Sequence, residues 1–510
     1  MGGVAVEPDW QTFEGRYSAG QPQVAWTHLV ADLETPVSAM LKLCGARPMS
    51  FLLESVEGGA VRGRYSIIGT APDLIWRARG NEAEINRVAL THPDRFEPMP
   101  GGTLAALRAL LAESRIALPE DLPPMAAGVF GYMGYDTVRL VERLETAKPD
   151  PLGVPDSILI RPTIILIFDA VRDQMTIVTT VFPKPGLTAR EAYAAATARL
   201  EEAVERLEGE MPHEAGAEPP SAQPALAQSN TPAAAYIGMV RKAKEYIAAG
   251  DIFQVVLSQR FSVPFALPPF ALYRALRRLN PSPFLYHLDF GGFAIVGSSP
   301  EILVRVRAGE VTIRPIAGTR PRGKTPSEDR ALAAELLADE KERAEHLMLL
   351  DLGRNDVGRV AEIGSVKVTD SFFLEHYSHV MHIVSNVTGR LAAGRHDAID
   401  ALMAGFPAGT VSGAPKVRAM QIIDELEASK RGPYAGCVGY FSADGEMDTC
   451  IVLRTAVVKD GIMHVQAGAG IVADSAPDME QGECQSKAAA LFRAAEEAIR
   501  FARRGPKGRG

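Results

Sequence analysis

Two periodicities of apolar residues divide the chain into many short strands and a few long helices. Apolar positions at helical spacing predict helices over residues 103–112, 189–207 and 233–249, and Gly250 closes the last of these. Runs rich in β-branched and aromatic residues predict strands at 51–55, 65–68, 158–169, 175–181, 253–261, 284–289, 293–296, 302–306 and 311–316. Tight turns such as Arg172-Asp173 and Gly291-Gly292 join neighbouring strands, which indicates antiparallel pairing. The predicted class is α+β, with antiparallel sheets packed against outer helices.

The segment 210–232 breaks this pattern, because it is rich in Pro, Ala, Ser and Gln and has no apolar periodicity. Such a composition buries too little surface to offset the entropy of ordering, so a linker or long loop is expected. It separates an N-terminal region, 15–209, from a C-terminal region, 233–505. With 510 residues, two domains or one bilobal unit are expected.

Composition narrows the function classes. The net charge is −8 and the pI is near 5.8, which argues against a nucleic-acid partner. No run of 18 apolar residues and no charged-then-apolar leader occurs, so no membrane association and a cytoplasmic location are expected. The four cysteines show no zinc spacing, and buried reduced thiols are the favoured interpretation.

The motif at 315–320, Pro-Ile-Ala-Gly-Thr-Arg, is predicted to be a turn after a strand. The NH of Gly318, the hydroxyl of Thr319 and the guanidinium groups of Arg320 and Arg322 are donors suited to an anion. The residue before Gly318 is Ala317, whose methyl group can do no chemistry.

Two helical segments carry carboxylates three residues apart, Glu342 with Glu345 and Glu480 with Glu483. That spacing places each pair on one helix face. If the helices faced each other, the carboxylates would suit Mg²⁺. From spacing alone, a solvated helix surface is the favoured interpretation.

Three further segments could bind or transform a small anion. In the apolar run 380–384, His382 could be a base or a core histidine, and His379 would point to the opposite face. The loop 407–416 enters a helix with Pro415 expected at its first position, Lys416 as a possible anion ligand, and Val417, Met420 and Ile423 as an inward stripe. A plain helix-start loop remains possible there. The glycines of 466–470 would let a ligand approach the backbone closely, near Arg454 at the end of another strand.

Taken together, these motifs resemble anthranilate synthase component I of the chorismate-utilising enzymes. Matching stretches run from Leu52 to Lys487 and include the segments 250–256, 297–301 and 351–356. The resemblance implies the fold of that family and Mg²⁺ as cofactor, with Glu345 and Glu483 as ligands and Glu342 and Glu480 close by. It also implies chorismate contacts at Gly318, Thr319, Tyr434, Arg454, Gly468, Ala469, Gly470 and Lys487.

The resemblance further implies a mechanism. Ammonia attacks C2 of chorismate while the C4 hydroxyl leaves, protonated by Glu301. The intermediate, 2-amino-2-deoxyisochorismate, then loses pyruvate as His382 takes the C2 proton, and Thr410 positions the base or the leaving portion. Relatives that add water carry lysine in place of Gln254, and relatives that make 4-amino-4-deoxychorismate carry lysine in place of Ala317. The absence of both lysines favours direct attack by ammonia.

A regulatory site and a partner are implied in the same way. Ser55, Pro283, Phe284 and Leu285 match the family's tryptophan feedback site, although the family usually has Tyr-Met where this chain has Phe284-Leu285. None of the cysteines lies in a glutaminase nucleophile elbow, so ammonia is expected from a separate glutamine amidotransferase subunit, in a heterotetramer, or from solution.

Two alternatives stay open at this stage. An enzyme that stops at 2-amino-2-deoxyisochorismate would share most of the same residues. A non-enzymatic tryptophan-sensing scaffold would keep the feedback site with a vestigial catalytic centre, but every expected acid, base and metal ligand is retained, which argues against it.

Overall fold

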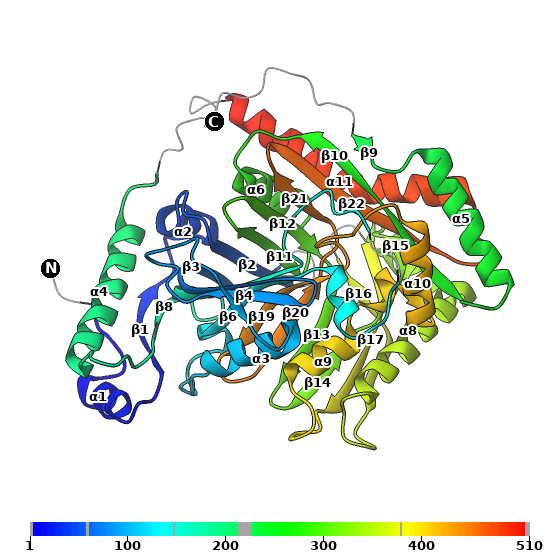
Figure 1. Ribbon diagram of the computed structural model, residues 1–510. Coiled ribbons are helices and arrows are strands. Elements are labelled where there is room, and N and C mark those ends of the chain that lie inside the picture. The colour runs from blue at the N-terminus through cyan, green and yellow to red at the C-terminus, as the bar shows by residue number, and fades with distance from the viewer. Residues whose placement is uncertain (1–3, 58–60, 146–147, 213–226, 378–379, 505–510) are drawn as a thin grey trace.

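The computed structural model describes residues 4–57, 61–145, 148–212, 227–377 and 380–504. All its paired strands are antiparallel, and helices cover the outside of the sheets (Figure 1). The predicted α+β class is confirmed.

The helices alternate with the strands along the chain. The α-helices are α1 (Trp10–Ser18), α2 (Pro36–Leu43), α3 (Thr103–Glu113), α4 (Ala189–Glu208), α5 (Ala233–Ala248), α6 (Pro269–Leu279), α7 (Pro326–Ala338), α8 (Glu340–Gly358), α9 (Ala398–Gly405), α10 (Lys416–Leu426) and α11 (Pro477–Arg504). Short 3₁₀ turns are η1 (Pro124–Ala126), η2 (Tyr135–Leu140) and η3 (Gly409–Val411).

The strands form two branches that share β7 (Ser157–Asp169), which pairs with β8 and β3 of the first branch and with β6 of the second. In pairing order, the first branch is β1 (Gln23–Val30), β8 (Gln174–Val181), β7, β3 (Val61–Arg79), β2 (Ser50–Glu57), β11 (Phe284–Asp289), β12 (Phe293–Ser299), β21 (Thr455–Lys459), β22 (Ile462–Ile471) and β10 (Gln254–Pro264). The second branch runs from β7 through β6 (Gly128–Met133), β19 (Cys437–Ser442), β20 (Met447–Ile451), β13 (Ile302–Arg307), β14 (Glu310–Ile313) and β17 (Val380–Arg390) to β15 (Ile316–Pro321) and β16 (Lys367–His376). Short strands β4 (Glu82–Asn86) and β5 (Glu97–Met99) extend β3, while β9 (Gln228–Ser229) and β18 (Gly413–Ala414) pair with β10.

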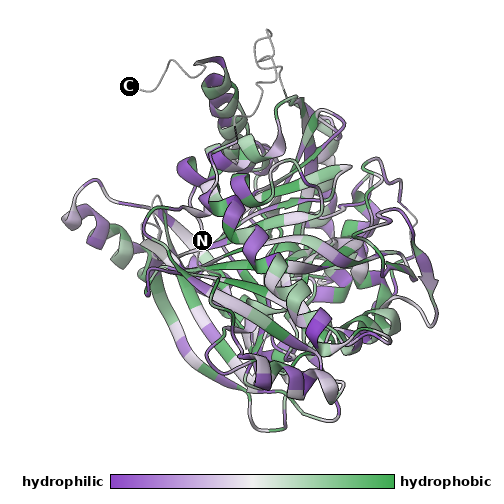
Figure 2. Ribbon diagram, turned by 90° about the vertical axis from the view of Figure 1, so that its left-hand side faces the viewer, coloured by the Kyte–Doolittle hydropathy of each residue, from purple (hydrophilic) through white to green (hydrophobic). Residues whose placement is uncertain are grey.

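Apolar side chains fill the space between the branches and under the helices. Phe51 of β2 stacks on Phe130 of β6 with ring centroids 4.6 Å apart, which joins the first branch to the second. Outside, α11 packs on β22, α10 on β10, and α8 on β15 and β17. Apolar bands alternate with polar ones along the strands and helices, as expected of elements buried on one face (Figure 2).

The two sequence regions share this sheet system. β2 pairs with β11, and β6 pairs with β19, so N-terminal strands lie between C-terminal ones. The proposed domain boundary stays a prediction, and the central part of the expected linker, 213–226, lies outside the described residues.

Several local predictions were wrong, and each has a physical reason. The expected strand 311–316 ends at Ile313, because Pro315 cannot donate a ladder hydrogen bond. The expected turn at 315–320 is instead β15, a strand with a register shift between Ala317 and Thr319. Pro415 caps α10 rather than beginning it, and Val417 is 41% exposed, whereas Met420 and Ile423 are buried as predicted.

Candidate active site

A cavity of about 730 Å³ opens where the far ends of the two branches meet. β10 and β22 form one wall, and β15 and β17 form another. α8 and the first turns of α11 close the remaining sides. Residues far apart in the sequence therefore converge on one chamber.

This cavity gathers nearly all the residues predicted to bind or transform substrate. Those lining it are Gln254, Glu301, Gly318, Thr319, Glu342, Glu345, His382, Thr410, Tyr434, Arg454, Gly468, Gly470, Glu480, Glu483 and Lys487. Ala469 lies between two of these on β22, with its side chain in the hydrophobic core. His379 lies outside the described residues.

Glu301 is a carboxyl group suited to donate a proton near neutral pH. Burial raises its pKa to about 7, and a hydrogen bond from Thr410 and the charges of Arg454 and Lys487 act in the opposite direction. The Thr410 hydroxyl donates to Glu301 Oε2 at 2.9 Å. A protonated carboxyl group in a cavity is the property required of a general acid.

His382 faces the same chamber from β17 and is prepared as a neutral base. Its Nδ1 lies 2.9 Å from the carbonyl oxygen of Gly318 and 3.0 Å from the Thr319 hydroxyl. A carbonyl oxygen can only accept, so Nδ1 carries the proton and Nε2 is left as the acceptor. Burial lowers the pKa of His382, which keeps the ring unprotonated at neutral pH.

The bulge in β15 creates this contact. Gly318 adopts a positive φ of 70°, which turns its carbonyl group toward His382. A Cβ atom there would lie 3.2–3.3 Å from Leu336, Glu342 and Ile383, so a side chain would also crowd the helices behind.

Arg454 supplies positive charge to the cavity. It follows β20 in a left-handed backbone conformation, with φ of 48°, which is uncommon for a non-glycine residue. Across the described ranges its guanidinium has no hydrogen-bond or ion-pair partner, and burial lowers its pKa. An unpaired guanidinium in a cavity is suited to a substrate carboxylate.

Gln254 and Gly470 form a matched pair across β10 and β22. Gln254 Nε2 donates to Glu345 Oε1 at 3.1 Å, and its buried Oε1 has no partner among the described residues. A Cβ atom on Gly470 would lie 2.7 Å from Gln254 Nε2. The glycine therefore makes room for the amide.

The four carboxylates predicted to bind magnesium lie in the cavity, on α8 and α11. Asp339 begins α8 by accepting hydrogen bonds from the NH groups of Lys341 and Glu342. Burial is the main cause that raises the pKa of Glu345 and of Glu480, and neighbouring carboxylates add to it. A bound cation would stabilise the charged form of these carboxylates, and their oxygen donors fit Mg²⁺. Among the described residues, no group of three or more acidic, His or Cys side chains is already placed around a metal position.

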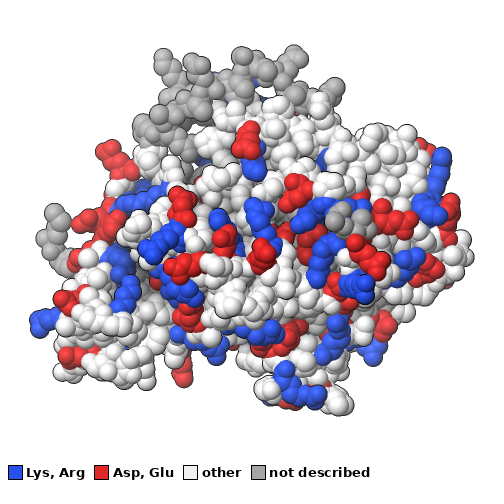
Figure 3. All heavy atoms as spheres, in the orientation of Figure 1, with Lys and Arg blue, Asp and Glu red and all other residues white. Residues whose placement is uncertain are grey.

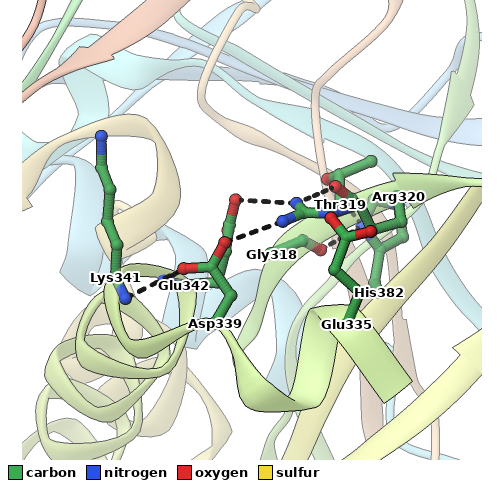
Figure 4. Close-up of polar contacts among 8 residues, drawn as sticks. All are labelled: Gly318, Thr319, Arg320, Glu335, Asp339, Lys341, Glu342 and His382. Atoms are coloured by element: carbon green, nitrogen blue, oxygen red, sulfur yellow. Dashed lines mark hydrogen bonds and ion pairs between the residues drawn. The ribbon is translucent and has the colours of Figure 1, made fainter. Parts of the chain in front are cut away.

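The arginines of the 315–322 motif are not free anion ligands, contrary to the sequence prediction. Figure 4 shows Arg320 directed at acidic side chains, and it pairs with Glu335 at 2.9 Å, Asp339 at 2.7 Å and Glu342 at 3.3 Å. Arg322 pairs with Asp329 at 2.8 Å. Both guanidinium groups are therefore neutralised by carboxylates of α7 and the start of α8. The local motif contains no information about these partners.

Lys416 was also expected to be available for an anion, and it is not. It is buried and pairs with Asp356 of α8 at 2.7 Å. Lys341, in contrast, is a cavity residue that the sequence motifs do not predict. It lines the cavity and pairs with Asp474 at 2.7 Å. Its only signal was its place directly before Glu342.

The residues matched to a tryptophan site lie elsewhere. Ser55, Phe284 and Leu285 line a second cavity of about 170 Å³, where the paired strands β3, β2 and β11 of the first branch face β19 and β20 of the second. Pro283 lies in the turn before β11. This cavity is separate in its lining from the larger one.

With this geometry in place, comparisons with known proteins define the class. The family model described as chorismate binding enzyme matches residues 65–493, and the chain belongs to this family of chorismate binding enzymes. Within it, the anthranilate synthase component 1 of Cereibacter sphaeroides is 58% identical over 499 residues, which cover 98% of this chain and 99% of the relative. The anthranilate synthase component 1 of Thermus thermophilus is 50% identical over 471 residues, which cover 92% of this chain and 97% of the relative.

Solved structures of similar fold come from the same class of enzymes. The crystal structure of anthranilate synthase component I from Streptococcus pneumoniae TIGR4 is similar at a TM-score of 0.74 and 37% identity, covering 91% of this chain and 99% of that one. The menaquinone-specific isochorismate synthase from Escherichia coli shares the fold at a TM-score of 0.67 and 20% identity, covering 95% and 98%.

Proposed function

We propose that this chain is the chorismate-binding subunit of an anthranilate synthase, which converts chorismate and ammonia into anthranilate and pyruvate. The observation that carries the proposal is the composition of one cavity. It combines a guanidinium that is unpaired among the described residues, a carboxyl group whose pKa burial raises to about 7, and an imidazole whose pKa burial lowers. Positions 254 and 317 carry no lysine.

In the first step ammonia forms a bond to C2 and the C4–O bond breaks. Glu301 donates its proton so that the C4 hydroxyl leaves as water. The new ammonium group at C2 then loses one proton to water, and Glu301 takes up a proton again. Thr410 holds the carboxyl group by its 2.9 Å hydrogen bond. Gln254 Oε1 has no partner among the described residues and would accept a hydrogen bond from ammonia, whereas the methyl group of Ala317 offers no acceptor.

In the second step 2-amino-2-deoxyisochorismate loses the C2 proton to Nε2 of His382, and the C3–O bond breaks. The side chain leaves as enolpyruvate, which takes up a proton from water at its methylene carbon and becomes pyruvate. The ring becomes aromatic. Arg454, Tyr434 and the backbone of β22 would hold the substrate during both steps. Magnesium held by Glu345 and Glu483, with Glu342 and Glu480 nearby, would neutralise a substrate carboxylate and orient the ring.

The proposal includes regulation and a partner. Tryptophan would bind in the smaller cavity at Ser55, Phe284 and Leu285 and inhibit the reaction. A separate glutamine amidotransferase would deliver ammonia, in a cytoplasmic heterotetramer.

No helix in the described part of the chain is long and apolar enough to cross a membrane. On the face seen in Figure 3, acidic and basic side chains are interspersed rather than gathered into a basic patch.

The test is direct. The protein is incubated with chorismate, Mg²⁺ and ammonium at high pH, and anthranilate is followed by its fluorescence while pyruvate is measured separately. Equal amounts of both products support the proposal. Accumulation of 2-amino-2-deoxyisochorismate without pyruvate would instead assign the alternative activity.

A further inference from the structure

Arg431 is a buried cation that the proposed mechanism does not use. It lies between α10 and β19, and only 2% of its surface is exposed. Its Nε donates to Glu427 Oε2 at 2.9 Å, and its Nη2 donates to Glu427 Oε1 at 2.6 Å. This bidentate pair neutralises the charge that burial would otherwise make costly.

The remaining donors of Arg431 point at the main chain of the active site. Nη1 donates to the carbonyl oxygen of Val411 and Nη2 to that of Val256, each at 2.7 Å. Val411 directly follows Thr410 in η3, and Val256 lies two residues after Gln254 on β10. Both valines line the larger cavity.

The planar guanidinium of Arg431 also packs against aromatic rings, and its partner Glu427 binds further residues of the same cavity wall. Its carbon lies 5.5 Å from the ring centre of Tyr434 and 4.7 Å from that of Tyr135. Glu427 Oε1 also accepts from the NH and the hydroxyl of Ser258, at 2.8 and 2.9 Å. The Ser258 hydroxyl in turn accepts from Gln466 Nε2 at 2.8 Å.

We propose that Arg431 is a positioning residue that holds one wall of the active site, formed by Val256, Thr410, Val411, Tyr434 and Gln466, in its catalytic arrangement. The inference rests on the proposed function. Three separate segments, η3, β10 and the loop before β19, depend on one planar fork. Lysine has no such fork and cannot make these contacts together.

Arg431→Lys is the first test variant. Loss of the Val411 contact should loosen Thr410 and its hydrogen bond to Glu301, so kcat should fall by about tenfold or more, whereas KM changes less. Since that hydrogen bond lowers the pKa of Glu301, the alkaline limb of the kcat–pH profile should move to higher pH. Free NH₃ is held constant across the profile, so that only enzyme groups titrate.

Arg139→Lys is the matched control. Arg139 is less buried than Arg431 but likewise has carboxylate partners. In the described structure it bonds to Asp136, Asp424 and the carbonyl oxygen of Leu144, none of which line the cavity. The control should change the melting temperature without moving the pH profile. An Arg431→Lys variant with the wild-type kcat and pH profile would overturn the proposal.

A second variant separates positioning from folding. The double substitution Arg431→Met with Glu427→Met removes both buried charges, so it should be more stable than Arg431→Met alone, which leaves Glu427 buried and unpaired. Ser258 loses its acceptor in the double variant. The carbonyl groups of Val411 and Val256 still lack their donor, so kcat should remain low. Recovery of the wild-type kcat together with stability would show that Arg431 only stabilises the fold. If the wild-type protein itself makes no anthranilate, the proposed function fails, and this outcome is distinct from both.

Discussion

At the scale of single residues, the site depends on environments rather than on unusual side chains. Glu301 and His382 are ordinary titratable groups whose pKa values burial moves in opposite senses, upward for the acid and downward for the base. Thr410 holds the proposed acid, and Gly318 and Thr319 hold the proposed base. The pair is thus ready for an acid step and a base step at the same pH.

The acid role predicts the behaviour of Glu301→Gln. Glutamine keeps the size of the side chain but cannot give a proton to the departing hydroxyl group, so kcat should fall by about 10²- to 10⁴-fold. Steady-state kinetics with chorismate and ammonium measure this. Activity within a factor of two of the wild type would assign the proton to another group.

Thr410→Val tests the coupling between the two side chains. The threonine hydrogen bond lowers the pKa of Glu301, so its loss raises that pKa above about 7. A general acid works while protonated, and activity is lost as the pH rises through its pKa. The alkaline limb of kcat, measured at constant free NH₃, should therefore move to higher pH in the variant, and a downward shift would contradict the assignment.

At the scale of elements, neighbouring strands fix how closely side chains can approach. β10 and β22 pair in a register that sets Val256 opposite Gly470, two residues after Gln254. The amide of Gln254 occupies the space that a side chain at position 470 would need. The glycine and the glutamine act as one unit although more than two hundred positions separate them.

This predicts a local effect of Gly470→Ala. The new Cβ atom would lie 2.7 Å from Gln254 Nε2 and displace that amide from Glu345. Saturation kinetics should show a weaker response to ammonium, with a rise in its apparent KM. Gly292→Ala is the control, since a Cβ atom there meets nothing within 4 Å. Equal kinetics of the two variants would contradict this account.

Sequence patterns predicted regular elements better than contacts. The helices α3, α4 and α5 and the strands β7, β8 and β11 lie within about two residues of their predicted bounds, because each has a clear periodicity. The turn expected at 315–320 is a bulged strand, since pairing with β17 is a long-range effect. The local motifs predict free cations at Arg320 and Lys416, because they contain no information about the carboxylates of α7 and α8 that pair with them. The Glu427–Arg431 ion pair is indicated by its i,i+4 spacing. The contacts of Arg431 with the carbonyl groups of Val411 and Val256 are long-range and could not be predicted from the sequence.

At the scale of the whole molecule, a buried histidine links stability to pH. His287 on β11 is 3% exposed, and neither ring nitrogen has a partner among the described residues. Burial lowers its pKa from 6.5 to about 3. Its ring is thus neutral in the folded protein, while in the unfolded chain it takes up a proton near its ordinary pKa.

The sign of the stability change follows from linkage. The folded pKa is depressed, so the contribution of His287 is complete above pH 6.5 and is lost as the pH falls toward about 3, by on the order of 1.4 kcal/mol per pH unit. His287→Leu removes the titrating group and its unpartnered nitrogens. Urea unfolding at pH 7 and pH 5 should show a smaller loss of stability for the variant than for the wild type. An equal loss would exclude His287 as a cause.

The arrangement of the whole chain also explains how one chamber receives residues from so many segments. The two sheet branches diverge at β7 and meet again at β10, β22, β15 and β17, where α8 and α11 bring in the carboxylates (Figure 1). The proposed function requires that this chamber use ammonia as the nucleophile and carry the reaction through to pyruvate release.

The most direct measurement supplies purified protein with chorismate, Mg²⁺ and either ammonium or no ammonium, and quantifies anthranilate, pyruvate and isochorismate. The account predicts anthranilate and pyruvate in a 1:1 ratio only when ammonium is present. Isochorismate formed from water in its absence, or an aminated product without pyruvate, would contradict it.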